Sequence, residues 1–267
     1  MKWGKIILVI FGAVVITAFG IDASDTLRGE SSTMLAQLVG TEAPRCPLGM
    51  QPIDSVPTLG CVDMYEAAPS TKCPHTSPVN AVDTLRNVQE AGCQADSREG
   101  MEPWRFVTRD QAMQLCARAG KRLPTNAEWY SLALSVTGDA SSCNVKSDTV
   151  AKTGSFDACV SSQQSYDLIG NVWEWVSDNV IEGSYQGAAL PGSGYVAQVN
   201  AHGIATVVSE QPEELFGEDY FWSKNEGVFG IIRGGFYGSG SDAGLYAVHA
   251  DTLPTSAVAG VGFRCVK

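Results

Sequence analysis

The sequence predicts an α+β domain that is rich in loops, poor in regular secondary structure and stapled by disulfides. Three observations lead to this prediction. The 267 residues include eight cysteines, 28 glycines and 12 prolines. Two short segments carry complete helix-capping patterns, and most of the remaining chain shows only the brief apolar runs typical of strands. The length and the apolar content of 44% suit a single domain with an ordinary core.

The N-terminus has the features of an export signal. Lys2 and Lys5 lie next to the N-terminus, and an uncharged apolar run follows over residues 6–20. A membrane span needs about 20 apolar residues, so this run is short for one, although an uncleaved anchor remains the alternative. We therefore expect a signal peptide at 1–23, a polar linker at 24–44 and one domain at 45–267, which is exported to the periplasm or the extracellular space.

The charge balance limits the classes of partner. The formal net charge is −11, and loss of the two leader lysines makes the chain more negative. A surface of this sign repels phosphate backbones and anionic lipids, while it tolerates divalent cations. We expect no nucleic-acid partner, and membrane contact only through an uncleaved N-terminal segment.

An even number of cysteines in an exported chain favours disulfides, although eight cysteines allow 105 pairings. Three sequential pairs suggest themselves because each closes a short polar loop: Cys46–Cys61, Cys73–Cys93 and Cys143–Cys159. Cys116 and Cys265 remain and would join a central helix to the C-terminal strand. Zinc is disfavoured because the chain has no Cys-x-x-Cys and only three scattered histidines.

The elements follow in chain order. Residues 46–103 are rich in cysteine and proline, so we expect loops and short strands there. Thr108 to Gln111 form a capping box, and the helix that they begin should end at Gly120. A second capping box runs from Thr125 to Glu128, with a helix that should end at Gly138.

The second half of the chain reads as strands and loops. Residues 172–176 alternate in the way of a strand with two different faces, and 228–233 and 260–265 are apolar enough for strands. Between them, residues 183–225 are first rich in glycine and alanine and then acidic. We expect this region to be a long surface excursion.

Four sequence pieces occur in a characteristic order: Gly-Lys-Arg-Leu-Pro-Thr at 120–125 with Glu128-Trp129, Gly-Asn-Val-Trp-Glu-Trp at 170–175, Arg-Gly-Gly at 233–235, and Gly-Phe-Arg-Cys at 262–265. Together they resemble the formylglycine-generating enzymes, the sulfatase-modifying factor family, over residues 104–178 and 228–266. The resemblance implies a loop-rich variant of the C-type lectin fold. It also implies a Cys116–Cys265 disulfide, and structural roles for Arg122 and Arg264 beside carboxylates such as Glu128 or Glu174.

The resemblance further implies a structural calcium site in the segment that leads into the second piece. Its ligands would be the side chains of Asp167 and Glu174 and the carbonyl oxygens of Gly170 and Val172. Oxygen donors from one tight turn are normal calcium ligands. The alternative is that both carboxylates only cap the turn or face water.

The family's oxidase chemistry requires copper on two cysteines that lie between the Arg-Gly-Gly and Gly-Phe-Arg-Cys pieces. This chain has no cysteine between Cys159 and Cys265, so we expect neither copper nor that activity. The catalytic candidates in this segment are Ser239, Asp242 and His249. His249 would act as a base with Asp242 or Asp251, but a structural hydrogen bond is the commoner role for such a histidine.

Two functions follow from these residues. The first is a non-catalytic binding or accessory domain, whose cleft recognises a protein or peptide at the cell surface or in the periplasm. The alternative is an atypical oxidoreductase that acts on a peptide or small molecule without a cysteine pair. Some relatives work without that pair, which keeps the second function open.

Overall fold

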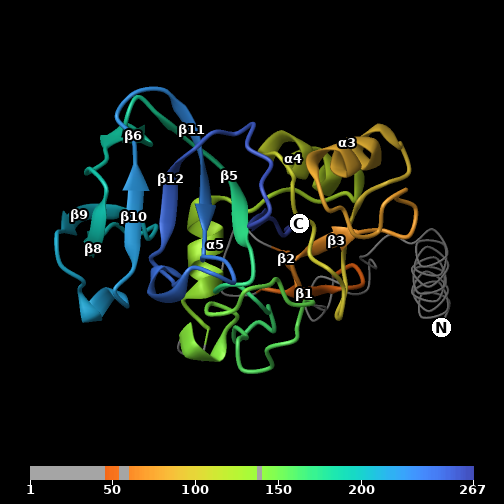
Figure 1. Cartoon of the computed structure of the whole chain (residues 1–267), viewed down its shortest axis with the longest axis horizontal. Coiled ribbons are helices and arrows are strands. Elements are labelled where there is room, and N and C mark those ends of the chain that lie inside the picture. Colours follow the sequence, from red (N-terminus) through yellow and green to blue (C-terminus); the bar gives the residue numbers. More distant parts are fainter. Residues whose placement is uncertain (1–45, 54–59, 137–139) are drawn as a thin grey trace, which may run out of the picture. The chain divides into compact units, whose positions relative to one another are not determined.

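The computed structural model describes residues 46–53, 60–136 and 140–267 (Figure 1). The expected signal peptide at 1–23 and linker at 24–44 lie outside these described residues. Within the described part, no helix is long and apolar enough to cross a membrane.

The largest sheet has nine strands in the order β7-β6-β5-β11-β12-β10-β8-β9, with β13 beside β5 (Figure 1). Neighbours are antiparallel, except that β10 with β12 and β13 with β5 are parallel. The strands are β5 (Trp173–Ile181), β6 (Ser184–Tyr185), β7 (Ala188–Ala189), β8 (Gly194–Val199), β9 (Ala205–Ser209), β10 (Tyr220–Ser223), β11 (Val228–Arg233), β12 (Val248–Thr252) and β13 (Val261–Gly262). The strands predicted near residues 173, 228 and 261 are confirmed as β5, β11 and β13.

The prediction of a surface excursion over 183–225 is wrong, because this region supplies β6 to β10 of the sheet. Glu182-Gly183 and Gln186-Gly187 have positive φ at both positions, as two-residue hairpin turns require. The glycines that suggested an irregular loop therefore reverse the chain between short strands. Tyr185 and Phe221 from this region are buried in the core.

The two predicted helices are confirmed, each with a complete capping box. Helix α4 is Arg109–Arg118 with Thr108 as N-cap, and α5 is Asn126–Ala133 with Thr125 as N-cap. Helix α5 ends earlier than expected, and Gly138, its predicted end, lies outside the described residues.

The region 46–103 contains a helix that the sequence did not predict. Helix α3 (Ala81–Gln89) starts at Asn80, whose side chain accepts a hydrogen bond from the Asp83 N–H. Val82, Leu85 and Val88 recur at helical spacing, but Val82 and Leu85 are exposed, and the fully buried residues of the helix are the polar Thr84 and Asn87. The strands β1 (Met50–Pro52), β2 (Cys61–Asp63), β3 (Ala67–Pro69) and β4 (Ala95–Ser97) complete this region.

At β5, side chains on both faces of the large sheet are buried. Trp173 and Trp175 of β5 pack with Leu115 of α4 on one face, and Val176 and Val180 pack with residues of α5 on the other. The first half of β5 thus lies inside the domain, which explains why both of its alternating sets include large apolar side chains.

The disulfides Cys73–Cys93, Cys116–Cys265 and Cys143–Cys159 are formed, which are pairs expected from the sequence. Cys46 and Cys61 are each disulfide-bonded as well, and none of the described cysteines is free. The Cys116–Cys265 bond links α4 to the C-terminal segment across 149 residues of chain.

Candidate functional site

The turn before β5 holds together segments that are far apart in the sequence. Asn171 has a φ of 55°, and its side-chain amide donates to the Glu66 carboxylate over 2.6 Å. The amide oxygen accepts from the Asn144 side chain and from the Ala151 N–H. At Gly170 a side chain would meet the Asn144 carbonyl oxygen at 2.5 Å. This piece of the family pattern therefore serves a close backbone approach.

Glu174 forms the central ion pair of the domain. Its carboxylate accepts from Arg264 through Nε at 2.8 and 2.9 Å and through Nη2 at 2.6 Å. The Trp129 indole N–H donates to the same carboxylate over 2.7 Å. Arg264 and Glu174 are fully buried. The expected structural partnership of these two residues is confirmed.

Arg122 forms the second expected pair at the surface end of α5. Its two terminal nitrogens each donate to one oxygen of Glu128 over 2.7 Å. The Arg122 side chain is 46% exposed, so this pair is far more hydrated than the Glu174–Arg264 pair. Glu128 is one of the two carboxylates that the resemblance offered as partners, and the structure assigns it to Arg122.

Glu66 is a buried acid that the sequence did not single out. It is fully buried, and it accepts from Asn171 and from the Val172 N–H. Burial and then the negative charges of Asp167 and Glu174 raise its pKa well above the usual range. Nothing in the local sequence distinguishes Glu66, because its neighbours in this cluster come from more than 100 residues later.

Only some of the residues expected to bind calcium fit that role in the structure. Glu174 does not fit a ligand role in this arrangement, because Arg264 and Trp129 occupy both of its oxygens. Asp167 is buried, and burial raises its pKa to about 6. Three buried carboxylates, those of Glu66, Asp167 and Glu174, surround a single arginine, and this excess of negative charge suits a cation. Calcium therefore stays a prediction, without Glu174.

No group of three or more histidine, cysteine or acidic side chains in the described ranges is arranged to hold a metal ion. That finding concerns side-chain clusters, whereas the predicted calcium site combines carboxylates with backbone carbonyl oxygens.

His249 lies on β12 at an apolar groove of about 320 Å³. Its ring stacks on Trp222 with 4.0 Å between centroids and meets the edge of Trp173 at 4.9 Å. Its Nδ1 is 2.9 Å from an Asp251 oxygen. Burial raises the pKa of Asp251, but the hydrogen bond and charge of His249 outweigh this and lower it below the usual value.

The other two catalytic candidates have different partners. The Ser239 hydroxyl accepts from the Phe236 N–H over 3.0 Å, which closes a turn. Asp242 belongs to the 3₁₀ helix η3 (Gly240–Asp242), and its negative charge contributes to raising the pKa of Asp219. The described contacts thus pair His249 with Asp251 and join neither Ser239 nor Asp242 to it.

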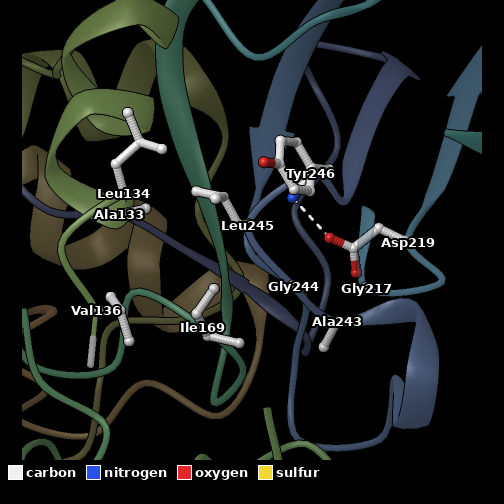
Figure 2. A pocket seen from close by; sticks show the side chains of 10 residues that line it. All are labelled: Ala133, Leu134, Val136, Ile169, Gly217, Asp219, Ala243, Gly244, Leu245 and Tyr246. Atoms are coloured by element: carbon white, nitrogen blue, oxygen red, sulfur yellow. Dashed lines mark hydrogen bonds between the residues drawn. The ribbon is translucent and has the colours of Figure 1, made fainter. Parts of the chain in front are cut away.

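A second cavity, of about 310 Å³, lies beside α5 and the segment that follows η3 (Figure 2). Most of its wall is apolar, with Leu134 and Val136 on one side and Leu245 and Tyr246 on the other. Asp219 supplies the only carboxylate among its lining residues, and its carboxylate lies beside Tyr246 in Figure 2. The complete lining is Ala133, Leu134, Val136, Ile169, Gly217, Asp219, Ala243, Gly244, Leu245 and Tyr246.

Asp219 is 2% exposed, and its two oxygens differ. Oδ2 accepts from the Tyr246 N–H over 2.6 Å, whereas Oδ1 is buried without a hydrogen-bond partner. A side chain at Gly244 would meet Oδ1 at 2.1 Å, so only glycine leaves room for this carboxylate. Burial raises the pKa of Asp219 to about 7. The sequence places Asp219 in an acidic run, and no local signal separates it from its exposed neighbours.

Arg233 is the nearest basic influence on this carboxylate. Its guanidinium donates to the carbonyl oxygens of Gly203 and Leu245, and it packs over the rings of Trp129 and Tyr130. Burial lowers its pKa to about 10, and its Nε has no hydrogen-bond partner. Among the described residues no ion pair joins Arg233 to a carboxylate, so its charge only partly offsets that of Asp219.

Three of the solved structures that are similar to this chain illustrate the fold. PvdO from Pseudomonas aeruginosa is 16% identical over 81% of this chain and 89% of that chain, with a TM-score of 0.45. CarF is 15% identical over 84% and 94%, with a TM-score of 0.40. The Major Tropism Determinant P3c variant is 15% identical over 82% and 55%, with a TM-score of 0.43, so this chain spans about half of its length.

A comparison with curated protein sequences returned no match. The model of the sulfatase-modifying factor enzyme 1-like domain matches residues 64–267, which is more than half of the chain and includes all four ordered sequence pieces. The fold and these pieces agree with that match. The chain therefore belongs to the sulfatase-modifying factor family, the formylglycine-generating-enzyme-like proteins.

Proposed function

We propose that this family member is a non-catalytic binding domain that takes a peptide or protein segment into the cavity at Asp219. The main support is the composition of that cavity. Residues 243–246 come from the segment that carries the cysteine pair in copper-dependent relatives, and here they are alanine, glycine, leucine and tyrosine. The surface that remains is an apolar pocket with one carboxylate, which suits recognition.

Copper-thiolate oxidation is not expected of this cavity. Cu(I) in such sites is held by deprotonated cysteines, and every cysteine of the chain is in a disulfide. Copper would have to be held by other donors, and the single carboxylate of the cavity is a poor substitute for two thiolates.

An oxidoreductase without the cysteine pair is the second candidate. It is favoured by the pKa of Asp219 at about 7, which would suit a general base that works near neutral pH. In that case the same cavity would hold a peptide or small molecule, and the difference would lie in turnover rather than in binding.

The four disulfides suit an oxidising, exported environment. We accordingly propose that the ligand is met at the cell surface or in the periplasm. A structural calcium ion near Asp167 belongs to the same proposal, because extracellular calcium sites are filled at roughly millimolar concentrations.

Oxygen uptake separates the two candidate functions. The purified, oxidised full chain would be incubated with copper or iron and with cysteine-containing peptides, and we expect no uptake above that of the metal alone. Metal-dependent turnover would overturn the binding-domain proposal in favour of the oxidoreductase.

Binding is then measured by calorimetry with hexapeptides that carry aliphatic, aromatic, acidic or lysine side chains. Ala243→Trp should fill the cavity and abolish binding. Leu85→Trp on the exposed side of α3 is the matched control and should bind as the wild type does. Equal binding by both variants would place the ligand elsewhere.

A further inference from the structure

The unsatisfied oxygen of Asp219 requires a donor. Oδ1 is buried and has no hydrogen-bond partner, while the other oxygen is bonded to the Tyr246 N–H. Buried polar atoms almost always have partners, because leaving one unsatisfied costs free energy. Because Asp219 lines a cavity, this exception points to a donor that enters from outside the chain and displaces the atoms that now cover Oδ1.

The backbone N–H groups of Tyr246 and Ala247 and the charge of Arg233 lower the pKa of this carboxylate, but they do not offset its burial. Arg233 of β11 is the basic group that acts on it, and both of its terminal nitrogens are bonded to carbonyl oxygens. Asp242 of η3 adds negative charge, which disfavours ionisation of Asp219. Tyr130 of α5 influences the pKa of Arg233 rather than that of Asp219. A cation that enters the cavity would supply the missing charge.

The remaining walls indicate what the cation carries. Leu134, Val136, Ile169 and Leu245 line the cavity opposite or beside the carboxylate (Figure 2). Apolar walls bind a hydrocarbon chain, and a volume of about 310 Å³ is at the small end for ligand pockets. A metal ion would find one carboxylate here where calcium takes six to eight oxygens. A ligand carboxylate would meet Asp219 and a chain of net charge −11.

We infer that the cavity selects ligands in which a protonated amine ends a short aliphatic chain, such as a lysine side chain, with Asp219 as the ammonium acceptor. An ammonium has three donors and no acceptor, so it matches Oδ1 in both charge and hydrogen bonding. This inference rests on the proposed function, since it names the ligand class of the same cavity.

The pH dependence follows from the state of Asp219. Amines bind the ionised carboxylate, so affinity is greatest above the pKa of about 7 and falls as Asp219 takes up a proton. Between pH 8 and pH 6 the ionised fraction decreases about tenfold, and the affinity for an amine should decrease by the same factor. An alcohol of equal length should show no such dependence.

The test uses n-pentylamine, n-pentanol and pentanoate as probes of the full chain. Binding would be followed by calorimetry and by the methyl NMR signals of Leu134, Ile169 and Leu245. At pH 8 we expect the amine to bind at least tenfold more tightly than the alcohol, and pentanoate not to bind. Asp219→Asn should remove both the preference for the amine and its pH dependence, whereas Glu218→Gln, an exposed neighbouring change, should keep both.

The wild-type pH profile keeps the inference testable if Asp219→Asn fails to fold. Equal, pH-independent binding of amine and alcohol would overturn the amine inference and leave the binding cavity in place. If none of the three probes moves the cavity methyl signals even at tens of millimolar, the proposed binding function at this cavity fails as well.

Discussion

The domain contains two buried acid–arginine systems, and they are satisfied to very different extents. Glu174 and Arg264 share three hydrogen bonds, and Trp129 donates a further one to the same carboxylate. Asp219 and Arg233 are equally buried, but each keeps a polar atom without a partner. The first system lies within the core, and the acid of the second lines a cavity.

This difference separates the structural from the functional use of buried charge. A buried charge is tolerated when its partners are complete, and the completed pair then fixes the segments that supply them. The family pattern includes Glu174 and Arg264, so the satisfied system explains why the pattern identifies the fold. Burying a carboxylate oxygen without a partner costs free energy of folding, and a ligand that donates to this oxygen removes that cost. The functional proposal therefore rests on Asp219.

The largest effect is expected from breaking the satisfied system. Arg264→Leu leaves three buried carboxylates without their cation, and we expect the free energy of unfolding to fall by about 3–5 kcal/mol. Arg122→Leu is the comparison: the Arg122 side chain is 46% exposed, but its removal leaves the Glu128 carboxylate, which is 5% exposed, without its arginine, so we expect a smaller loss of about 1–3 kcal/mol. Urea denaturation measures both, and equal losses would contradict the distinction between the two pairs.

The second prediction concerns the unsatisfied system. Burial raises the pKa of Asp219 from 3.8 to about 7, so the folded state holds a proton that the unfolded state releases. The stability from this group is therefore fully present below about pH 4 and is lost as the pH rises through 7. Asp219→Asn does not titrate, and we expect it to be more stable than the wild type at pH 8 by on the order of 2–4 kcal/mol.

That advantage should shrink as the pH is lowered toward 4, which thermal or urea unfolding at several pH values would reveal. The exposed change Glu218→Gln serves as control and should follow the wild type throughout. A variant Asp219→Asn that is less stable than the wild type at pH 8 would mean that the ionised carboxylate is stabilised by more than the Tyr246 N–H.

The third and smaller effect concerns a calcium ion bound near Asp167, where three buried carboxylates surround the single positive charge of Arg264. A cation that binds only the folded state at ten to a hundred times its Kd stabilises it by about 1–3 kcal/mol. We expect a chelator to lower the Tm of the wild type, and Asp167→Asn to remove that sensitivity. Asp148→Asn, an exposed change, should retain it. If the wild type melts alike with and without chelator, protons rather than calcium neutralise Glu66 and Asp167.

The two systems also differ in how far the sequence predicts them. Local patterns were sufficient for α4, α5 and β5, because capping boxes and alternation involve neighbouring residues. The family pattern offered Glu128 and Glu174 as partners for Arg122 and Arg264, and the structure decided which carboxylate pairs with which arginine. Helix α3 was missed although Val82, Leu85 and Val88 recur at helical spacing after the N-cap Asn80, because the cysteines and prolines of this region favoured loops.

Asp219 and Glu66 could not be predicted in the same way. Their environments are made by residues distant in the chain, such as Tyr246 for Asp219 and Asn171 for Glu66. In sequence each is one acid among 29 acidic residues. Burial, which gives both their raised pKa values, is a property of the folded chain alone.

The smallest predicted effect tests whether Asp219 is tuned by its surroundings or only by burial. Asp242 is partly exposed on η3, and its negative charge adds to the rise in the pKa of Asp219. Asp242→Asn removes that charge, so the ionised form of Asp219 becomes easier to reach and its pKa falls. Amine binding should then persist to lower pH than in the wild type, with affinity at pH 8 nearly unchanged.

The pH midpoint of n-pentylamine binding measures this shift directly. Asp148→Asn removes an equal but exposed charge elsewhere and should leave the midpoint in place. High salt should reduce the shift, because the interaction of a partly exposed charge is screened while the burial of Asp219 is not. If the midpoint does not move in Asp242→Asn, burial alone raises the pKa of Asp219. The pH range of amine binding is then set by how deeply the carboxylate is buried and not by the charged residues around it.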